Sequence, residues 1–124
     1  MKKQAVSLSV VLCALSFAQT QEPPAGVLLN ADEAKVFVTG KKLTFIRSSD
    51  NNKVRWDLRE DGFLYGNNFT SNSRDAGKWK INELGEVCAE WRGKSVNTCY
   101  GIRKKGDKTE LVAPTFLSEI TSVD

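Results

Sequence analysis

The sequence predicts an all-β fold: a single antiparallel sheet of about seven strands, curved into a roll or half-open barrel, with a short N-terminal helix. Three observations lead to this prediction. Apolar and polar residues alternate along much of the chain after Lys41, which is the period of half-buried strands. Turns rich in glycine, asparagine and aspartate separate the alternating runs. Cys88 and Cys99 lie close enough in sequence to join neighbouring strands.

Residues 1–18 are typical of a secretory signal peptide. Lysines precede an apolar run, and Ser16 and Ala18 occupy the small-residue positions of a cleavage site. The run is shorter than the about 20 apolar residues that cross a bilayer. We therefore expect cleavage after Ala18, no integral membrane anchor, and a protein that is exported, either periplasmic or secreted.

The chain that remains has the size of one domain. Cleavage leaves 106 of the 124 residues, close to the most common domain length. We expect an extended leader over 19–28 and a single β domain over 29–124. Loss of Lys2 and Lys3 leaves 16 Lys and Arg against 15 Asp and Glu, so the net charge falls from +3 to +1. This balance predicts no nucleic-acid partner.

A short helix is predicted over 31–38. Asn30 can cap its first turn, and Glu33 can reach back to the backbone of Asn30. Gly40 ends it. So short a helix must pack on something else to be stable.

The alternation is clearest in residues 53–59. One face carries Val54, Trp56 and Leu58, and the other carries only charged residues, as in a half-buried antiparallel strand. We expect 43–47 to pair with it through the polar loop 49–52, with Leu43 opposite Leu58 and Phe45 opposite Trp56. An Asp61-Gly62 turn then leads into a third strand over 63–65.

Residues 66–76 form the longest stretch without a periodic pattern. It is polar apart from Phe69, and we expect a surface loop. Such loops often carry function, so Asn68, Phe69 and Arg74 are candidate binding residues; the alternative is a plain connector. Asn68-Phe69-Thr70 also matches a glycosylation acceptor.

Three turns between 77 and 113 predict three strand registers. A turn at 83–85 places Ile81 opposite Val87, a turn at Gly93-Lys94 places Cys88 opposite Cys99, and a turn at 106–107 places Ile102 opposite Leu111. The registers agree with one another. They assign the following residues to one apolar face: Trp79, Ile81, Val87, Ala89, Trp91, Val96, Thr98, Tyr100, Ile102, Leu111 and Ala113.

The two cysteines of the mature chain have one possible pairing in an oxidising compartment. The Cys88–Cys99 disulfide would lie on the polar face and stabilise the fold by about 2 to 3 kcal/mol. A tight turn at Gly93-Lys94 makes this a widely spaced cross-strand pair, whereas a longer loop over 92–95 makes it a close one. Both alternatives stay open. After Pro114, Phe116, Leu117 and Ile120 have helical spacing, so the tail is either a short helix or a frayed end.

The order of helix, Asp61-Gly62 turn, Gly77-x-Trp79, Cys88-x-x-Trp91 and Cys99 resembles a group of small exported bacterial domains of unknown function. The resemblance covers about residues 31–112. It implies a secreted antiparallel domain with a one-loop disulfide and no assigned activity. Gly77-x-Trp79 is also similar to the signature of lipocalin-type barrels, where it lies near the first strand; here it follows three predicted strands.

The sequence offers little catalytic chemistry. It has no histidine, which removes imidazole bases and histidine metal ligands, and no nucleophile elbow, phosphate loop or dinucleotide motif. We predict no cofactor and no metal. An enzyme would have to use carboxylates, such as Glu90 with Glu86 or Asp57, to cleave an envelope glycan.

Aromatic residues suggest binding instead. Trp56, Trp79 and Trp91, together with Tyr100, would converge on one face, either as solid core or as the wall of a ligand cavity. The leading hypothesis is a non-enzymatic binding module for another envelope protein or a small ligand, using a sheet edge or the 66–76 loop. The alternatives are the carboxylate-dependent hydrolase and a purely structural envelope protein.

Overall fold

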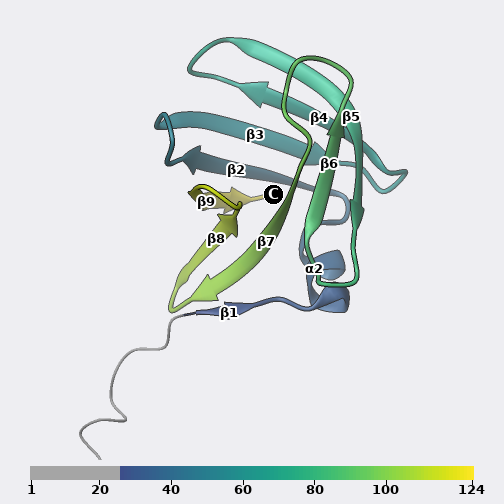
Figure 1. Cartoon of the computed structure of the whole chain (residues 1–124), viewed down its shortest axis with the longest axis vertical. Helices are drawn as coiled ribbons and strands as arrows, with labels where there is room; N and C mark the ends of the chain where they lie inside the picture. The colour runs from purple at the N-terminus through teal and green to yellow at the C-terminus, as the bar shows by residue number, and fades with distance from the viewer. Residues whose placement is uncertain (1–25) are drawn as a thin grey trace, which may run out of the picture.

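A computed structural model describes residues 26–124, so the predicted signal peptide and most of the predicted leader lie outside the described residues. The described chain forms nine strands and one helix (Figure 1). The elements are β1 (Val27–Leu28), α2 (Ala31–Val38), β2 (Lys41–Arg47), β3 (Asn52–Leu58), β4 (Phe63–Asn68), β5 (Ser73–Ile81), β6 (Val87–Trp91), β7 (Thr98–Lys105), β8 (Lys108–Val112) and β9 (Leu117–Val123).

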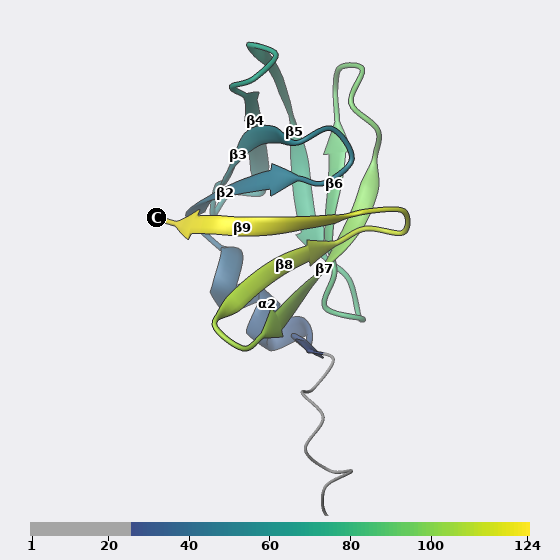
Figure 2. The same cartoon turned by 90° about the vertical axis from the view of Figure 1, so that its left-hand side faces the viewer.

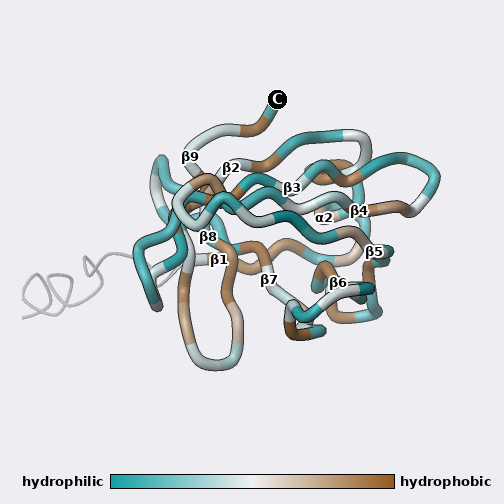
Figure 3. Tube along the Cα trace, turned by 90° about the horizontal axis from the view of Figure 1, so that it is seen from above, coloured by the Kyte–Doolittle hydropathy of each residue, from teal (hydrophilic) through white to brown (hydrophobic). Residues whose placement is uncertain are grey.

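Strands β2 to β9 close into an 8-stranded antiparallel barrel. Each strand pairs with the next along the chain, and β9 pairs with β2. Seen from above, the strands follow one another round a ring in this order (Figure 3). The predicted all-β class, the single curved sheet and the N-terminal helix are confirmed. The additional strand β1 pairs with the end of β7, through Val27 opposite Lys104 and Leu28 opposite Arg103.

Helix α2 lies at the lower end of the barrel (Figures 1 and 2). It begins as predicted, because the Asn30 side chain accepts a hydrogen bond from the Glu33 N–H and Glu33 accepts one from the Asn30 N–H, each at 2.9 Å. Ala34 and Val38 are fully buried. The helix therefore closes this end with apolar side chains.

The lower half of the barrel is filled by aliphatic side chains. Six residues from six strands are completely shielded from solvent there: Leu43, Leu58, Leu64, Val87, Ile102 and Leu111. They alternate with outward-facing residues, as barrel strands require. This packing with α2 leaves the opposite end as the open one.

Most predicted registers are confirmed. Ile81 lies opposite Val87, Cys88 opposite Cys99, and Ile102 opposite Leu111. The turn at 83–85 has Gly85 at φ 83°, a left-handed conformation that favours glycine. The turns thus set the strand alignment in this half of the chain.

The predicted pairing of β2 with β3 is wrong by two residues. Leu43 lies opposite Trp56 and Phe45 opposite Val54, because the turn begins one residue earlier and places Asn51 at φ 60°, which asparagine tolerates. A two-residue shift keeps every side chain on its predicted face.

One further prediction is wrong in part, and one open alternative is decided. The 66–76 stretch is mostly strand, with only 69–72 left as loop, because its polar residues lie near the open end, where inward-facing side chains still reach water. Of the two alternatives for the next turn, the structure has the longer loop, over 92–97, in which the Asn97 side chain accepts a hydrogen bond from the Trp91 N–H at 2.8 Å. Val96, predicted inside, is 76% exposed.

The tail is neither a helix nor frayed. Residues 117–123 form β9, with Ser118 and Ile120 buried. β9 fills the space between β2 and β8 and pairs with both. Hydrogen bonds to two existing strands outweigh the weak helical pattern of so short a segment.

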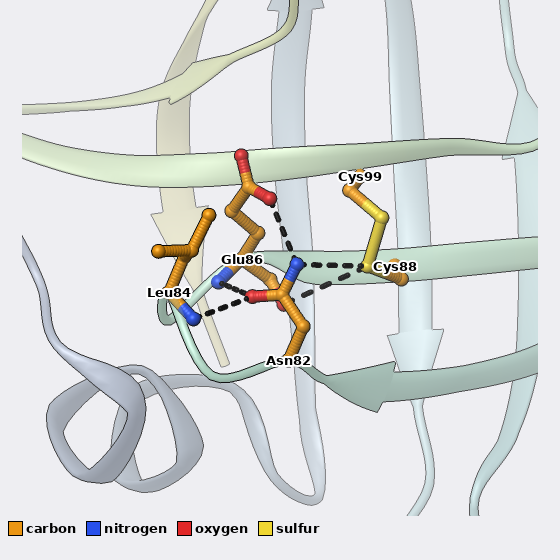
Figure 4. The surroundings of a disulfide bond; sticks show 5 residues. All are labelled: Asn82, Leu84, Glu86, Cys88 and Cys99. Carbon is orange, nitrogen blue, oxygen red and sulfur yellow. Dashed lines mark hydrogen bonds between the residues drawn. A yellow bond between two sulfur atoms is a disulfide. The ribbon is translucent and has the colours of Figure 1, made fainter.

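The disulfide joins β6 and β7 on the outer face (Figure 4). The Cα atoms of Cys88 and Cys99 are 3.9 Å apart, so the pair is of the close kind that the longer loop allows. In the preceding turn the Asn82 side chain accepts hydrogen bonds from the Leu84 and Glu86 N–H groups, at 3.0 and 2.9 Å. Its amide also donates to Cys88 Sγ at 3.6 Å.

We predict that replacement of Cys88 and Cys99 together by serine lowers the free energy of unfolding by about 2 to 3 kcal/mol, since the crosslink restricts the unfolded chain. Urea unfolding with and without reductant measures this. The reduced native protein should match the variant. A native protein with two reactive thiols under denaturant would contradict the disulfide.

Ser118 is 1% exposed, and its hydroxyl has no hydrogen-bond partner among the described residues. An unpaired buried hydroxyl is destabilising. We therefore expect Ser118→Ala to stabilise the protein by about 1 kcal/mol, measured by urea unfolding. Ser122→Ala, on the exposed part of the same strand, is the control and should change stability little. Destabilisation by Ser118→Ala would show that the hydroxyl does have a partner.

Candidate functional site

The open end of the barrel forms a cavity of about 1030 Å³. We call it the mouth cup. Four loops surround it: 48–51, 69–72, 92–97 and 113–116. Its apolar lining includes Phe45, Val54, Trp56, Trp91, Tyr100 and Phe116, with Val96 and Pro114 from the loops. Its inward polar lining includes Arg47, Asn52, Asn68, Ser73 and Thr98. A mouth of this kind is where small 8-stranded barrels hold a ligand.

Trp56 is the centre of the cup floor. Its ring makes edge-to-face contacts with Phe45, Tyr100 and Trp91, at centroid distances of 5.1, 5.0 and 5.9 Å. It is only 4% exposed. Phe116 extends the wall by packing on Tyr100 at 6.3 Å. The aromatic face is therefore both core and cavity wall: Trp56 fills the middle of the barrel, whereas Trp91 and Phe116 are only partly buried.

Gly66 makes room for this arrangement. It lies opposite Trp56 on β4, and a Cβ placed on it would come 2.7 Å from the Trp91 ring. A side chain at this position would push Trp91 towards the open space of the cup. The glycine therefore determines how far the tryptophan ring can enter the barrel.

Polar groups meet the aromatic wall at two points. Burial raises the pKa of the Tyr100 phenol above its ordinary 10.0, although the hydrogen bond with Thr98 and the charge of Arg47 act in the opposite direction. Tyr100 thus stays a neutral hydrogen-bonding group at physiological pH. Arg47 donates from Nε and Nη2 to the two carboxylate oxygens of Asp50, at 3.0 and 2.7 Å, and this hydrogen-bonded pair lowers the pKa of Asp50.

Asp75 holds the loop over 92–97 against the barrel. Its carboxylate accepts hydrogen bonds from the N–H groups of Gly93 and Ser95, at 2.9 and 3.2 Å. Burial acts to raise the pKa of Asp75, but the hydrogen bonds from Ser95, Ala76 and Gly93 outweigh it and keep the pKa below its ordinary 3.8. A Cβ added at Gly93 would come 2.8 Å from the carboxylate, so a side chain there would displace Asp75.

The structure separates the predicted site residues. Trp56, Trp91 and Asn68 line the cup, and Arg74 lies at its rim. Trp79 does not line the cup; its indole N–H donates to the Arg59 carbonyl at 2.8 Å. Phe69 is exposed but also outside the cup, with the Arg55 guanidinium 5.9 Å from its ring.

Sequence reasoning missed Arg47, Asp75 and Phe116 as residues of the cup. Arg47 continues the inward series of Leu43 and Phe45, so the period of two already placed it inside. Asp75 and Phe116 lay in stretches predicted to be loop and helix, and no sequence signal placed them at the mouth.

The proposed catalytic carboxylates do not come together. Asp57 lines an outer hollow over β2–β5, and Glu90 lines a different one over β5–β7. Glu86 is held in the turn by the amide of Asn82 at 2.8 Å. Over residues 26–124, no group of three or more His, Cys, Asp or Glu could hold a metal ion. In the same range, no helix is long and apolar enough to cross a lipid bilayer.

Comparison with known proteins adds no relative: no protein-family model, curated protein or solved structure matches the chain.

We predict that Asp75→Asn loosens the loop over 92–97, because a neutral amide oxygen accepts hydrogen bonds less strongly than a carboxylate. Amide hydrogen exchange of Gly93 and Ser95 should become faster. The pKa of Asp75 is lower in the folded state than in the unfolded state. The ionised carboxylate therefore stabilises the loop at pH values above 3.8, and this stabilisation is lost as the pH falls through the pKa of the folded state.

The protection factors of these two amides, which correct for the intrinsic pH dependence of exchange, should therefore fall in acid in the wild-type protein and should not change with pH there in the variant. Asp107→Asn, on the exposed turn between β7 and β8, is the control. Unchanged exchange at both amides in Asp75→Asn would rule out the loop-holding role.

Proposed function

We propose that this protein is an exported, non-enzymatic binding module that takes a small, planar and largely apolar ligand into the mouth cup. The observation that supports this most is the cup itself: about 1030 Å³ of space walled by aromatic rings in the half of the barrel that core side chains do not fill. Ligand sites are typically apolar hollows of this size with a few polar groups.

The polar groups of the cup indicate the ligand's chemistry. Tyr100 offers a neutral hydroxyl at the floor, and Asp50 and Asp75 are both engaged by other groups of the protein. At the rim, Arg74 and Lys94 form no salt bridge within the described chain. Among otherwise similar ligands, these charges favour one with a negatively charged group at the open end.

Other predicted modes of recognition have less support. Strand addition needs a free sheet edge, but β2 to β9 pair on both sides and leave β1 as the edge strand. The loop tip at Phe69 is exposed but does not line the cup. No observation favours the hydrolase, since its carboxylates lie in separate places. Export is supported by the disulfide, which is typical of oxidising compartments.

The test is binding of the fluorescent probes N-phenyl-1-naphthylamine, which is neutral, and 1-anilinonaphthalene-8-sulfonate, which is anionic. We expect both probes to bind and to quench the emission of Trp56 and Trp91. The anionic probe should have the higher affinity because of the positive charges at the rim. Phe116→Ala should weaken binding about fivefold, or about 1 kcal/mol, because it removes part of the aromatic wall.

Two matched variants locate the binding. Phe63→Ala, on the outer face of β4, and Phe69→Ala, at the loop tip, each remove the same ring and should change affinity less than about twofold. A larger effect of Phe69→Ala than of Phe116→Ala would place recognition at the loop instead. Absence of binding by either probe would overturn the cup proposal.

A further inference from the structure

The outer face of the barrel carries a second hollow, of about 700 Å³, over strands β2 to β5. We call it the basic cradle and define it by Lys42, Arg55, Tyr65, Arg74, Ala76 and Arg92. Four of these six residues are cationic. We propose that the cradle binds an acidic carbohydrate, with a sugar ring on Tyr65 and its carboxylate, sulfate or phosphate group between Arg74 and Arg92.

Strand register builds the cradle. Tyr65 lies directly opposite Ala76, and the Arg92 N–H donates to the Ala76 carbonyl at 2.8 Å, so the three form one row across the strands. Arg74 lies two residues from Ala76 on the same face. The small Ala76 side chain leaves a depression between one aromatic ring and two guanidinium groups.

The charges of the cradle suit an oxyanion. Among the described residues, Lys42, Arg74 and Arg92 form no salt bridge, so their charges are not neutralised within the fold. Guanidinium groups bind carboxylate, sulfate and phosphate through paired hydrogen bonds.

Two acidic residues also line this hollow, and neither blocks the anion site. Asp75 is occupied by the N–H groups of Gly93 and Ser95. Asp57 lies opposite Tyr65, on the side away from Ala76. It is two strands from Ala76, or about 10 Å. Arg92 is one strand from Ala76, or about 5 Å. Asp75 Oδ1 also accepts the Ala76 N–H at 2.8 Å, but the hollow as a whole is lined by four cationic side chains and two carboxylates, so its net charge is positive.

The remaining groups suit a sugar better than a nucleic acid. Tyr65 is 48% exposed; the Arg59 guanidinium lies 6.0 Å from the centroid of its ring, and the exposed part of the ring can pack on the C–H face of a sugar. Asn67 beside it carries an amide that can hydrogen-bond hydroxyl groups. Single-stranded nucleic acid needs successive stacking rings along a charged groove, whereas within residues 26–124 Tyr65 is the one aromatic residue that lines this hollow.

The test measures binding of the whole mature protein to polygalacturonate and heparin, with uncharged dextran and oligothymidylate as comparisons. We expect binding to both acidic glycans, weakening with added salt, and none to dextran. The double variant Tyr65→Ala/Arg92→Gln should lose at least about tenfold in affinity. Phe63→Ala/Lys108→Gln removes one exposed ring and one exposed cation elsewhere, and should lose less than about twofold.

Neither Tyr65 nor Arg92 lines the mouth cup, so the double variant should bind the naphthyl probes like the wild type. This separates the two proposals: loss of glycan binding with intact probe binding supports the cradle alone. Equal losses in the two double variants would show unspecific charge attraction and overturn it. Oligothymidylate binding as tightly as the glycans, or no glycan binding at low salt, would also overturn it.

Discussion

The hydrogen bonds of β9 to both β2 and β8 are the interaction on which the barrel depends. Ile120 lies opposite Phe45 on one side and Thr109 on the other. Beyond the strand, Lys42 and Asp124 exchange backbone hydrogen bonds at 2.9 and 3.0 Å. Without β9, the sheet would present two long unpaired edges, which are costly and prone to aggregate. Closure converts an open meander into a ring with an inside and an outside.

A ring of this size gives its two ends different properties. At the lower end, α2 and the shielded leucine and isoleucine side chains fill the interior, so this half acts as the hydrophobic core. At the upper end, aromatic rings around Trp56 form a floor above which the barrel is open. The aromatic rings therefore pack on the core below them and line the proposed binding site above. Glycine at position 66 is what allows Trp91 to take part in both.

Much of the fold followed from local patterns. The alternation of Val54, Trp56 and Leu58 and the turn at Gly85 depend on neighbouring residues only, so strand identity and three registers could be predicted. The turn between β2 and β3 begins one residue earlier than predicted. This changes the register of the two strands by two residues and leaves every side chain on its predicted face. The tail was predicted wrongly because β9 pairs with β2, which is far away in the sequence. Residues 66–68 and 73–76 were predicted to be loop because their polar side chains hide the strand pattern, although 66–68 pair with 73–75. For these two reasons the candidate site was predicted only in part: Trp56 and Trp91 were found, whereas Asp75 and Phe116 were not.

The sequence by itself determined the β class, the helix that begins at Asn30, the inward and outward faces of most strands and the pairing of Cys88 with Cys99. The class, the helix and the faces depend on side-chain periodicity and on turn chemistry, which are local, whereas the cysteine pairing follows because two cysteines remain after the predicted cleavage. The tertiary structure decided that the sheet closes, that the aromatic face is half core and half cup, and that Tyr65, Arg74 and Arg92 surround one hollow. The sheet closes through hydrogen bonds between strands that are far apart in the sequence. This closure determines which residues of distant strands share a surface.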